Sequence, residues 1–223
     1  MTHAQVAPYG SWKSPITSDL IVSETIYPGL TAVEGQTTYW IERRPSEGGR
    51  NIIVQRTPGG QIFDMTPAPF NARTRVHEYG GGDFAVSDGI IYFSNFADQR
   101  IYRVKPGSEP QPITPAEQYC YADGIIDRQR GRMICVREDH TVAGREAVNT
   151  LVSIALDGND AGQVLASGNA FYSSPRLSPD GSRLASLTAA KTFAAPAAAT
   201  LAPVLGADRS GVGPLRRAAR VFR

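Results

Sequence analysis

Residues with chemically useful side chains are concentrated in short polar segments between apolar runs. One segment carries His77, Glu78 and Tyr79 directly before three glycines, and a later one reads Arg137-Glu138-Asp139-His140. An imidazole beside a carboxylate could transfer protons. We expect one binding face to gather these groups, with eight candidate residues: His77, Glu78, Tyr79, Tyr121, Asp123, Arg137, His140 and Tyr172.

Both histidine segments also have plain structural explanations. His77 and Glu78 are neighbours, and neighbouring strand residues point to opposite faces, so we expect a hydrogen-bonded structural His77. The run that ends at His140 has contiguous spacing, which does not build a tetrahedral metal site. We therefore expect a solvated loop with local ion pairs there, and no bound metal.

A nucleophilic centre is not expected in this chain. The Gly-x-Ser-x-Gly turn that exposes a catalytic serine is absent, and the three histidines are His3, His77 and His140. Gly80-Gly81-Gly82 lacks the strand-to-helix context of a phosphate-binding loop, so these glycines are expected to permit close packing instead. We predict no catalytic residue and no cofactor.

The apolar runs around these segments repeat with one pattern: a short strand, a glycine turn and a second strand. The turn glycines Gly35, Gly89, Gly131 and Gly181 are 54, 42 and 50 residues apart. This spacing is typical of one four-stranded propeller blade per repeat. The pattern fades after Ala185, whereas a closed propeller has about 4–8 blades. The predicted fold class is all-β, an open partial β-propeller of about three and a half blades.

Blade geometry explains why the polar segments should lie together. The connection into each blade and the loop between its second and third strands meet at the same face, whereas the tight hairpin turns lie at the other. The connections into blades two, three and four cover residues 75–82, 118–124 and 169–175, and the loops carry Arg43-Arg44, Asn95 and residues 137–140. Loops on one face of a rigid scaffold are the usual place for binding.

Composition limits the class of partner. The net charge is +2, but residues 1–188 carry −3 and residues 189–223 carry +5. The acidic body argues against nucleic acid as a partner. Residues 189–223 contain 11 alanines and one acidic residue, and this composition resembles a disordered linker or an out-of-frame reading of GC-rich DNA.

The expected location is the cytoplasm. Cys120 and Cys135 lie in apolar strand-like runs and are expected to be reduced, buried thiols. The first thirty residues lack the basic end and apolar core of a signal peptide. No apolar stretch approaches the ~20 residues of a membrane span, so no membrane partner is expected.

Several segments resemble the N-terminal propeller of prolyl oligopeptidase-family serine peptidases, with the nearest likeness to bacterial dipeptidyl aminopeptidase/acylaminoacyl-peptidase-like members. The resemblance covers roughly residues 8–188 and is most specific in His77-Glu78-Tyr79-Gly80-Gly81-Gly82. It extends to three more blocks: residues 15–17, residues 137–140 and residues 174–181.

The resemblance implies that the eight candidate residues form a substrate-access face, over an α/β-hydrolase domain that carries the triad in the family. Peptide would then be a partner of the intact relative only. This sequence matches no part of that domain, so we expect an inactive, truncated fragment.

The expected division is a surface arm at 1–14, a partial propeller at 15–188 and a tail at 189–223, with an edge strand or short helix at residues 15–23. Self-association through open sheet edges is expected. The alternative is a stand-alone propeller-like binding or scaffolding module. Coding sequence for further blades and a serine elbow downstream in the gene would distinguish the two.

Overall fold

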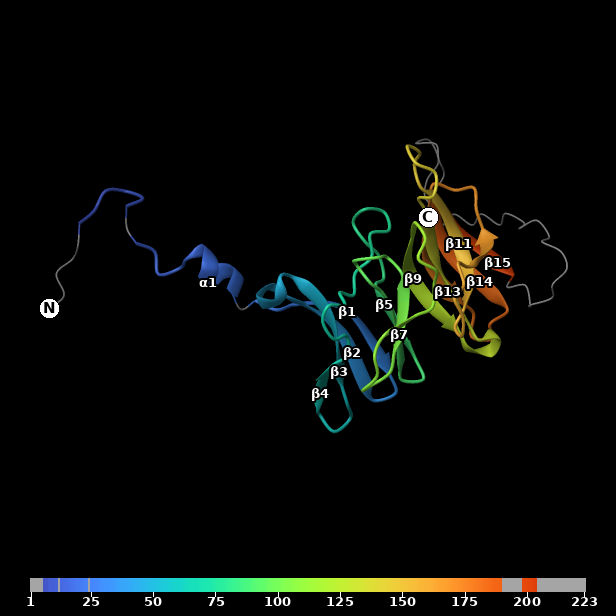
Figure 1. Ribbon diagram of the computed structural model, residues 1–223, viewed down its shortest axis with the longest axis horizontal. Helices are drawn as coiled ribbons and strands as arrows, with labels where there is room; N and C mark the ends of the chain where they lie inside the picture. Colours follow the sequence, from blue (N-terminus) through green and yellow to red (C-terminus); the bar gives the residue numbers. More distant parts are fainter. Residues whose placement is uncertain (1–5, 12, 24, 190–197, 204–223) are drawn as a thin grey trace.

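The computed structural model describes residues 6–11, 13–23, 25–189 and 198–203. The described strands form four antiparallel sheets, each built from strands that are consecutive in the chain. We refer to these sheets as blades 1 to 4. Figure 1 shows them side by side in chain order, with blade 1 and blade 4 at opposite ends of an open array.

Three of the blades have four strands. Blade 1 contains β1 (Tyr27–Glu34), β2 (Thr37–Arg44), β3 (Arg50–Arg56) and β4 (Ile62–Asp64). Blade 2 contains β5 (Phe84–Ser87), β6 (Ile90–Ser94), β7 (Ile101–Val104) and β8 (Gln111–Pro112). Blade 3 contains β9 (Tyr119–Asp127), β10 (Arg132–Asp139), β11 (Val148–Ala155) and β12 (Gln163–Ala166). Short 3-10 turns at Pro45–Glu47 and Arg128–Arg130 connect strands within blades 1 and 3. The predicted all-β, open partial propeller is confirmed.

Blade 4 extends further than the sequence pattern indicates. It contains β13 (Phe171–Leu177), β14 (Arg183–Ala189) and β15 (Ala198–Pro203). The sequence analysis assigns β15 to the tail, but its backbone pairs with β14 from Arg183↔Pro203 to Thr188↔Ala198. Backbone pairing needs no apolar alternation, which is why the pattern missed it. Residues 190–197 and 204–223 lie outside the described residues, so the expected disorder there stays a prediction.

The N-terminal part of the chain extends away from the blades (Figure 1). Val6 and Tyr9 are almost fully exposed, as expected for a surface arm. Of the two possibilities for residues 15–23, the structure has the helix: α1 spans Ser18–Ser23, and the Thr17 hydroxyl accepts the Leu20 N–H at 3.1 Å as an N-cap. In the described part of the chain, no helix is long and apolar enough to cross a membrane.

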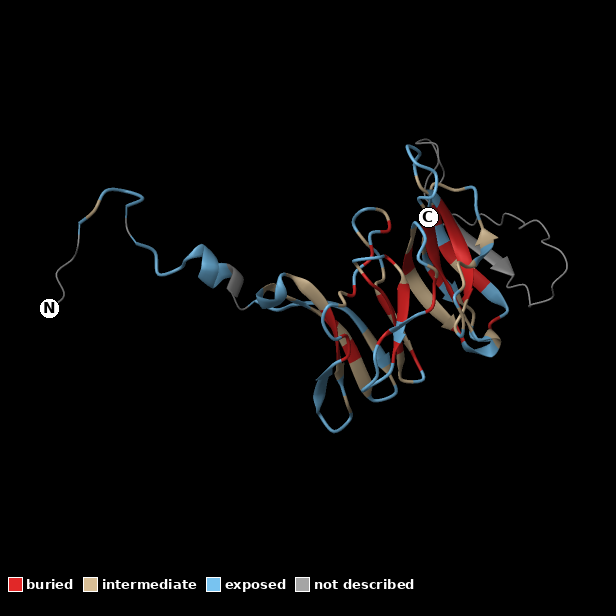
Figure 2. Cartoon of the chain, in the orientation of Figure 1, coloured by how far each residue is buried: buried red, intermediate tan, exposed pale blue. Residues whose placement is uncertain are grey.

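Three apolar cores lie between successive blades, and the segments coloured as buried in Figure 2 follow them. Strand alternation divides each middle sheet between two cores. In β10, Met133 and Cys135 pack toward blade 2, whereas Ile134 and Val136 pack toward blade 4. Each blade therefore depends on its neighbours for burial, as expected for a repeat architecture.

The hairpin turns of all four blades meet on one face. The Glu34 carboxylate accepts the N–H groups of Asp88 and Gly89 at 2.7 and 2.8 Å and pairs with Arg128 at 2.6 Å. Arg130 continues the series by donating to the Gly181 carbonyl at 3.1 Å. These contacts connect the turns of blades 1, 2, 3 and 4 in order, and we call this side the hairpin face.

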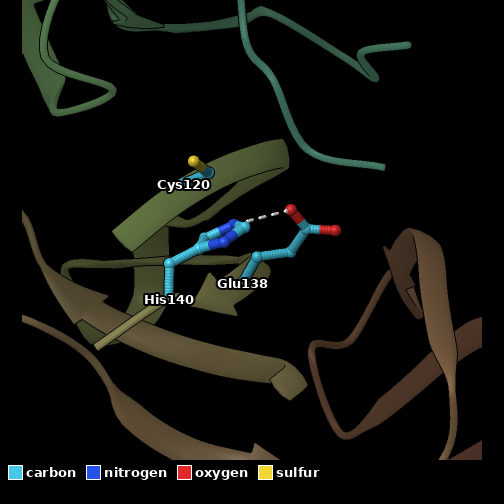
Figure 3. A group of neighbouring side chains, drawn as sticks. All are labelled: Cys120, Glu138 and His140. Atoms are coloured by element: carbon cyan, nitrogen blue, oxygen red, sulfur yellow. Dashed lines mark hydrogen bonds and ion pairs between the residues drawn. The ribbon is translucent and has the colours of Figure 1, made fainter. Parts of the chain in front are cut away.

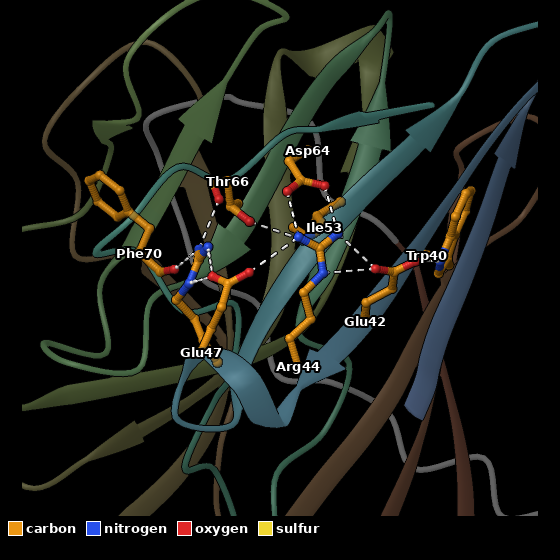
Figure 4. Close-up of polar contacts among 9 residues, drawn as sticks. Trp40, Glu42, Arg44, Glu47, Ile53, Asp64, Thr66 and Phe70 are labelled. Carbon is orange, nitrogen blue, oxygen red and sulfur yellow. Dashed lines mark hydrogen bonds and ion pairs between the residues drawn. The ribbon is translucent and has the colours of Figure 1, made fainter. Parts of the chain in front are cut away.

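The outward sheet face of blade 1 is covered by an ion-pair network (Figure 4). Arg44 makes bidentate contacts with Asp64 at 2.6 and 2.7 Å and with Glu42 at 2.9 and 2.8 Å. Trp40 donates its indole N–H to Glu42 at 3.0 Å, and Glu47 also pairs with Arg44. The acidic and basic groups of this network pair with each other. This face of blade 1 is therefore polar, unlike the apolar faces that pack between successive blades.

The two end blades nevertheless expose apolar side chains, and we expect the chain to self-associate. Val33 and Ile62 of blade 1 are 68% and 60% exposed, and Leu187 of blade 4 is 52% exposed. Unpaired strand edges beside such groups template pairing between chains. Sedimentation at several concentrations should give a rising mean mass. A monomer that keeps one sharp thermal transition on dilution would contradict this.

Candidate functional site

The connections into the blades and the loops between second and third strands meet on the face opposite the hairpin turns. Arg75 N–H donates to the Gln99 side chain at 2.7 Å, and Ala72 forms an isolated bridge with Asn95. His140 N–H donates to the Gln118 carbonyl at 2.9 Å. Each pair joins a connection to the loop of the same blade, so the expected common face is present. We call it the access face.

His77 joins three blades at this face. It follows blade 1 in the chain and precedes β5, and its N–H donates to Glu138 Oε1 of β10 at 2.8 Å. Its ring nitrogen Nε2 lies 3.1 Å from the Tyr172 carbonyl of β13, and Nδ1 lies 3.2 Å from the same Glu138 Oε1. Phe171 packs edge-on against the imidazole at 5.1 Å between ring centroids. His77 is therefore hydrogen-bonded, as expected, and its contacts join three blades.

The backbone around His77 differs from the expected strand. His77 and Glu78 lie in a turn with φ of 57° and 64°, closed by the Gly80 N–H donating to the Val76 carbonyl at 2.9 Å. Two successive left-handed non-glycine residues are uncommon and carry strain. The turn directs the imidazole inward, with its side chain 8% exposed, and leaves Glu78 exposed.

The charges of this cluster stabilise each other. The hydrogen bond with Glu138 raises the pKa of His77 above its usual value, against the opposing effect of burial. Burial alone would raise the pKa of Glu138, but hydrogen bonds from His77 and His140 outweigh it and lower that pKa. The geometry therefore favours an imidazolium–carboxylate pair, since each group stabilises the charged form of the other.

Cys120, Glu138 and His140 place a sulfur, an oxygen and a nitrogen within 4.8 Å of one another (Figure 3). His140 Nε2 lies 3.2 Å from Glu138 Oε2, a contact that a hydrogen bond explains by itself. Burial raises the pKa of the Cys120 thiol to about 11, so it is protonated at neutral pH. Three donors are one fewer than the four of a closed structural zinc site, and no metal is assigned here.

Asp123, in the middle of β9, ties three blades together. Its two carboxylate oxygens accept the N–H groups of Gly82 at 2.6 Å and Ser174 at 2.7 Å. Its own N–H donates to the Gly82 carbonyl at 2.9 Å. Asp123 and Ser174 both have positive φ, and both sit where the register of β9 or β13 shifts against its partner. These β-bulges turn the inner strands so that their backbones reach the carboxylate.

Two of the three glycines, Gly81 and Gly82, are required by close packing, as the sequence predicts, and Gly80 is required by its backbone conformation. A Cβ on Gly81 would lie 3.0 Å from the Ala122 Cβ, and one on Gly82 would lie 2.9 Å from Asp123 Oδ1. Gly80 has a φ of 99°, which side chains rarely adopt. The run therefore lets the connection into blade 2 lie directly against the inner strand of blade 3.

The other predicted residues divide by exposure. Glu78, Tyr79 and His140 are exposed, so solvent or a ligand can reach them. Tyr121, Arg137 and Tyr172 are buried at 1%, 8% and 2% exposure.

The buried residues have structural contacts. The Tyr121 hydroxyl donates to the Ala161 carbonyl at 3.2 Å, and Arg137 donates to the same carbonyl at 3.0 Å while stacking on Tyr119. Tyr121 and Arg137 therefore pack behind the access face and do not line its surface. Cys120 and Cys135 are free thiols, as predicted, although Cys120 is only half-buried.

Sequence reasoning missed a polar pocket of about 220 Å³ between blades 1 and 2 at this face. Arg43 and Asn51 of blade 1 line it together with Arg73, Tyr79 and Asp83 of the connection into blade 2. The sequence predicts a loop position for Arg43, but the structure places it at the end of β2. Arg73 and Asp83 are 30 and 40 residues further along the chain. These positions follow no sequence spacing, because they come together only when the two blades pack.

Comparison with solved structures gives close matches. A puromycin-hydrolysing peptidase of Mycobacterium tuberculosis superposes with a TM-score of 0.82 at 31% identity, covering 96% of this chain and 35% of its own. A puromycin hydrolase gives 0.81 at 30% identity, with the same coverage of each chain. A serine-to-alanine variant of puromycin hydrolase, complexed with PGG, gives 0.83 at 31% identity and covers 95% of this chain and 35% of its own. No protein-family model matches the chain, and no curated protein does.

The fold and the access face define a β-propeller module of the kind found in peptidases. The chain spans about a third of the length of the solved structures that it matches. It belongs to the propeller domains of the prolyl oligopeptidase family.

Proposed function

We propose that the chain is the substrate-filtering portion of a serine peptidase of this family, and that it is inactive alone. Its access face would contact peptides or acylated peptides before they reach a hydrolytic centre in a separate domain. The observation that carries the proposal is the match to a puromycin-hydrolysing peptidase over 96% of this chain but 35% of the other. A solved relative complexed with PGG supports a peptide-like ligand.

The arrangement of the access face supports filtering rather than chemistry. His77 is paired with Glu138 and the Tyr172 carbonyl, and His140 is paired with Glu138. Within the described residues neither imidazole is hydrogen-bonded to a serine or cysteine, which a nucleophile–base pair requires. Exposed Glu78 and Tyr79 remain free to meet a passing ligand.

The purified chain should therefore not hydrolyse aminoacyl or peptidyl aryl amides. A fluorophosphonate that labels activated serines should leave it unmodified, whereas a full-length puromycin hydrolase labels under the same conditions as the positive control. Stoichiometric labelling of this chain at one serine would contradict the proposal, since it would reveal an activated nucleophile.

A further inference from the structure

The pocket between blades 1 and 2 is lined by two arginines and one acidic residue, and neither arginine forms a salt bridge within the described residues. Arg43 is exposed, and its side chain makes no ion pair or hydrogen bond within the described residues. Its neighbour Arg44 differs completely, because Arg44 is held by Asp64 and Glu42 on the outward face of the sheet. Strand alternation sends the two neighbouring side chains to opposite faces, and only Arg43 reaches the pocket.

The second cation, Arg73, is oriented by an aromatic ring. Its guanidinium carbon lies 4.9 Å from the centroid of the Phe96 ring, and no salt bridge to Arg73 occurs among the described residues. A guanidinium packed on a ring keeps its N–H groups available at the edge, where a planar acceptor can bind in a bidentate way. Two arginines from different blades thus line one cavity.

The charge of the pocket suits a single negative charge. Asp83 is the one acid in the lining, and its Oδ1 accepts the Thr74 N–H at 2.7 Å. Burial raises the pKa of Asp83 to about 6, with the Thr74 hydrogen bond and the Arg73 charge opposing the rise and Asp123 adding to it. At neutral pH two cations face one carboxylate, so a monoanion complements the pocket better than a dianion does.

We infer that this pocket binds a carboxylate group, presented by the C-terminus or an acidic side chain of a peptide that reaches the access face. The inference rests on the proposed function, because it specifies which peptides the filter would hold. A volume of about 220 Å³ accommodates a carboxylate with several waters, each of which occupies about 30 Å³. Arginine–carboxylate pairs are among the stronger charge-assisted hydrogen bonds.

The test is a titration of the isotope-labelled full chain by NMR, read at the amides of Gly80 and Gly81, which line the pocket. The probes are triglycine with a free C-terminus, triglycine amide, N-acetyl-aspartate amide and inorganic phosphate. We expect triglycine to shift these amides and triglycine amide to bind about tenfold more weakly, because it lacks the charged acceptor. Shifts with N-acetyl-aspartate amide would show that an acidic side chain can supply the bound carboxylate, as well as a C-terminus.

Arg43→Gln and Arg73→Gln should each weaken triglycine binding by about tenfold, and Arg56→Gln is the matched control. Arg56 is exposed on blade 1 and does not line the pocket, so its loss changes only net charge. Equal binding of triglycine and its amide would overturn the carboxylate site while leaving peptide binding, and thus the proposed function, intact. The carboxylate site would also be overturned if phosphate bound more tightly than triglycine, or if no probe shifted the amides. The labelling experiment would still test the proposed function separately.

Discussion

Replacing Asp123 with alanine is expected to lower the free energy of unfolding by about 3 kcal/mol, since two hydrogen bonds to a charged acceptor are lost. The carboxylate is the shared acceptor for Gly82 and Ser174, which belong to the connection into blade 2 and to blade 4. Without it, two backbone N–H groups at the inner strands lose their partner together. Urea unfolding followed by circular dichroism measures the change.

Two companion variants separate the hydrogen bonds from the backbone strain at φ 57°. Asp123→Asn keeps the tolerance for this left-handed conformation, but its amide group would face a backbone N–H, so we expect about half of the loss. Asp157→Asn is the control, because Asp157 is exposed in a turn. If Asp123→Ala unfolds at the same urea concentration as the unmodified chain, the carboxylate does not tie the blades together.

Replacing Glu138 with alanine is expected to cost about 3 kcal/mol, as for breaking a buried ion pair. Both partners are nearly buried, with side chains 8% exposed at His77 and 7% exposed at Glu138. The alanine removes the acceptor of the His77 backbone N–H and the ion-pair partner of the His77 ring, and it releases His140. Blades 2, 3 and 4 then lose the contacts that Glu138 and His77 provide between them, and keep those of Asp123.

The pH dependence of stability gives a sharper test of the same pair. Because the folded pKa of His77 is raised, its contribution is complete below about pH 6.5 and is lost as pH rises through the folded pKa. Because the folded pKa of Glu138 is lowered, its contribution is complete above about pH 4.3 and is lost as pH falls through the folded pKa. The pair therefore stabilises most between these two values.

Glu138→Gln should reduce the pH dependence of stability at both the acidic and the neutral end of the range. The glutamine still offers an oxygen acceptor to the His77 N–H. Glu146→Gln, at an exposed position, should leave the profile unchanged. Thermal melts from pH 4 to pH 8 provide the measurement. A Glu138→Gln profile that parallels the unmodified chain would mean that His77 and Glu138 do not form a charged pair.

The repeat pattern predicted the blades well because local signals determine them. Asp88-Gly89 forms the expected hairpin turn, with φ of 54° and 70°, and β5 and β6 pair on either side of it. The apolar run at residues 133–136 was predicted as a strand, and it forms the buried middle of β10. β15 was missed because its pairing with β14 depends on backbone hydrogen bonds, and its composition carries no signal.

The site was harder to predict, since it depends on contacts between blades. Tyr121 and Arg137 were predicted on a connection and in a solvated loop, but packing buries both. The expected loop at residues 137–140 is wrong, because β10 continues to Asp139. The role of Asp123 depends on bulges in β9 and β13, which shift the register by a residue without any clear sequence signature. The hydrogen bonding of His77 was predicted correctly, although its turn conformation was not predicted.

The hairpin face and the access face hold the blades together by different physical means. On the hairpin face, Arg128 is 56% exposed where it meets Glu34, so salt screens this contact. At the inner strands Asp123 binds backbone N–H groups, and on the access face Glu138 is buried, so salt has little effect on these contacts. Rising ionic strength therefore weakens the exposed Glu34–Arg128 contact more than it weakens the contacts of Asp123 and Glu138. The salt dependence of stability thus reports on the hairpin face, and the pH dependence reports on the access face.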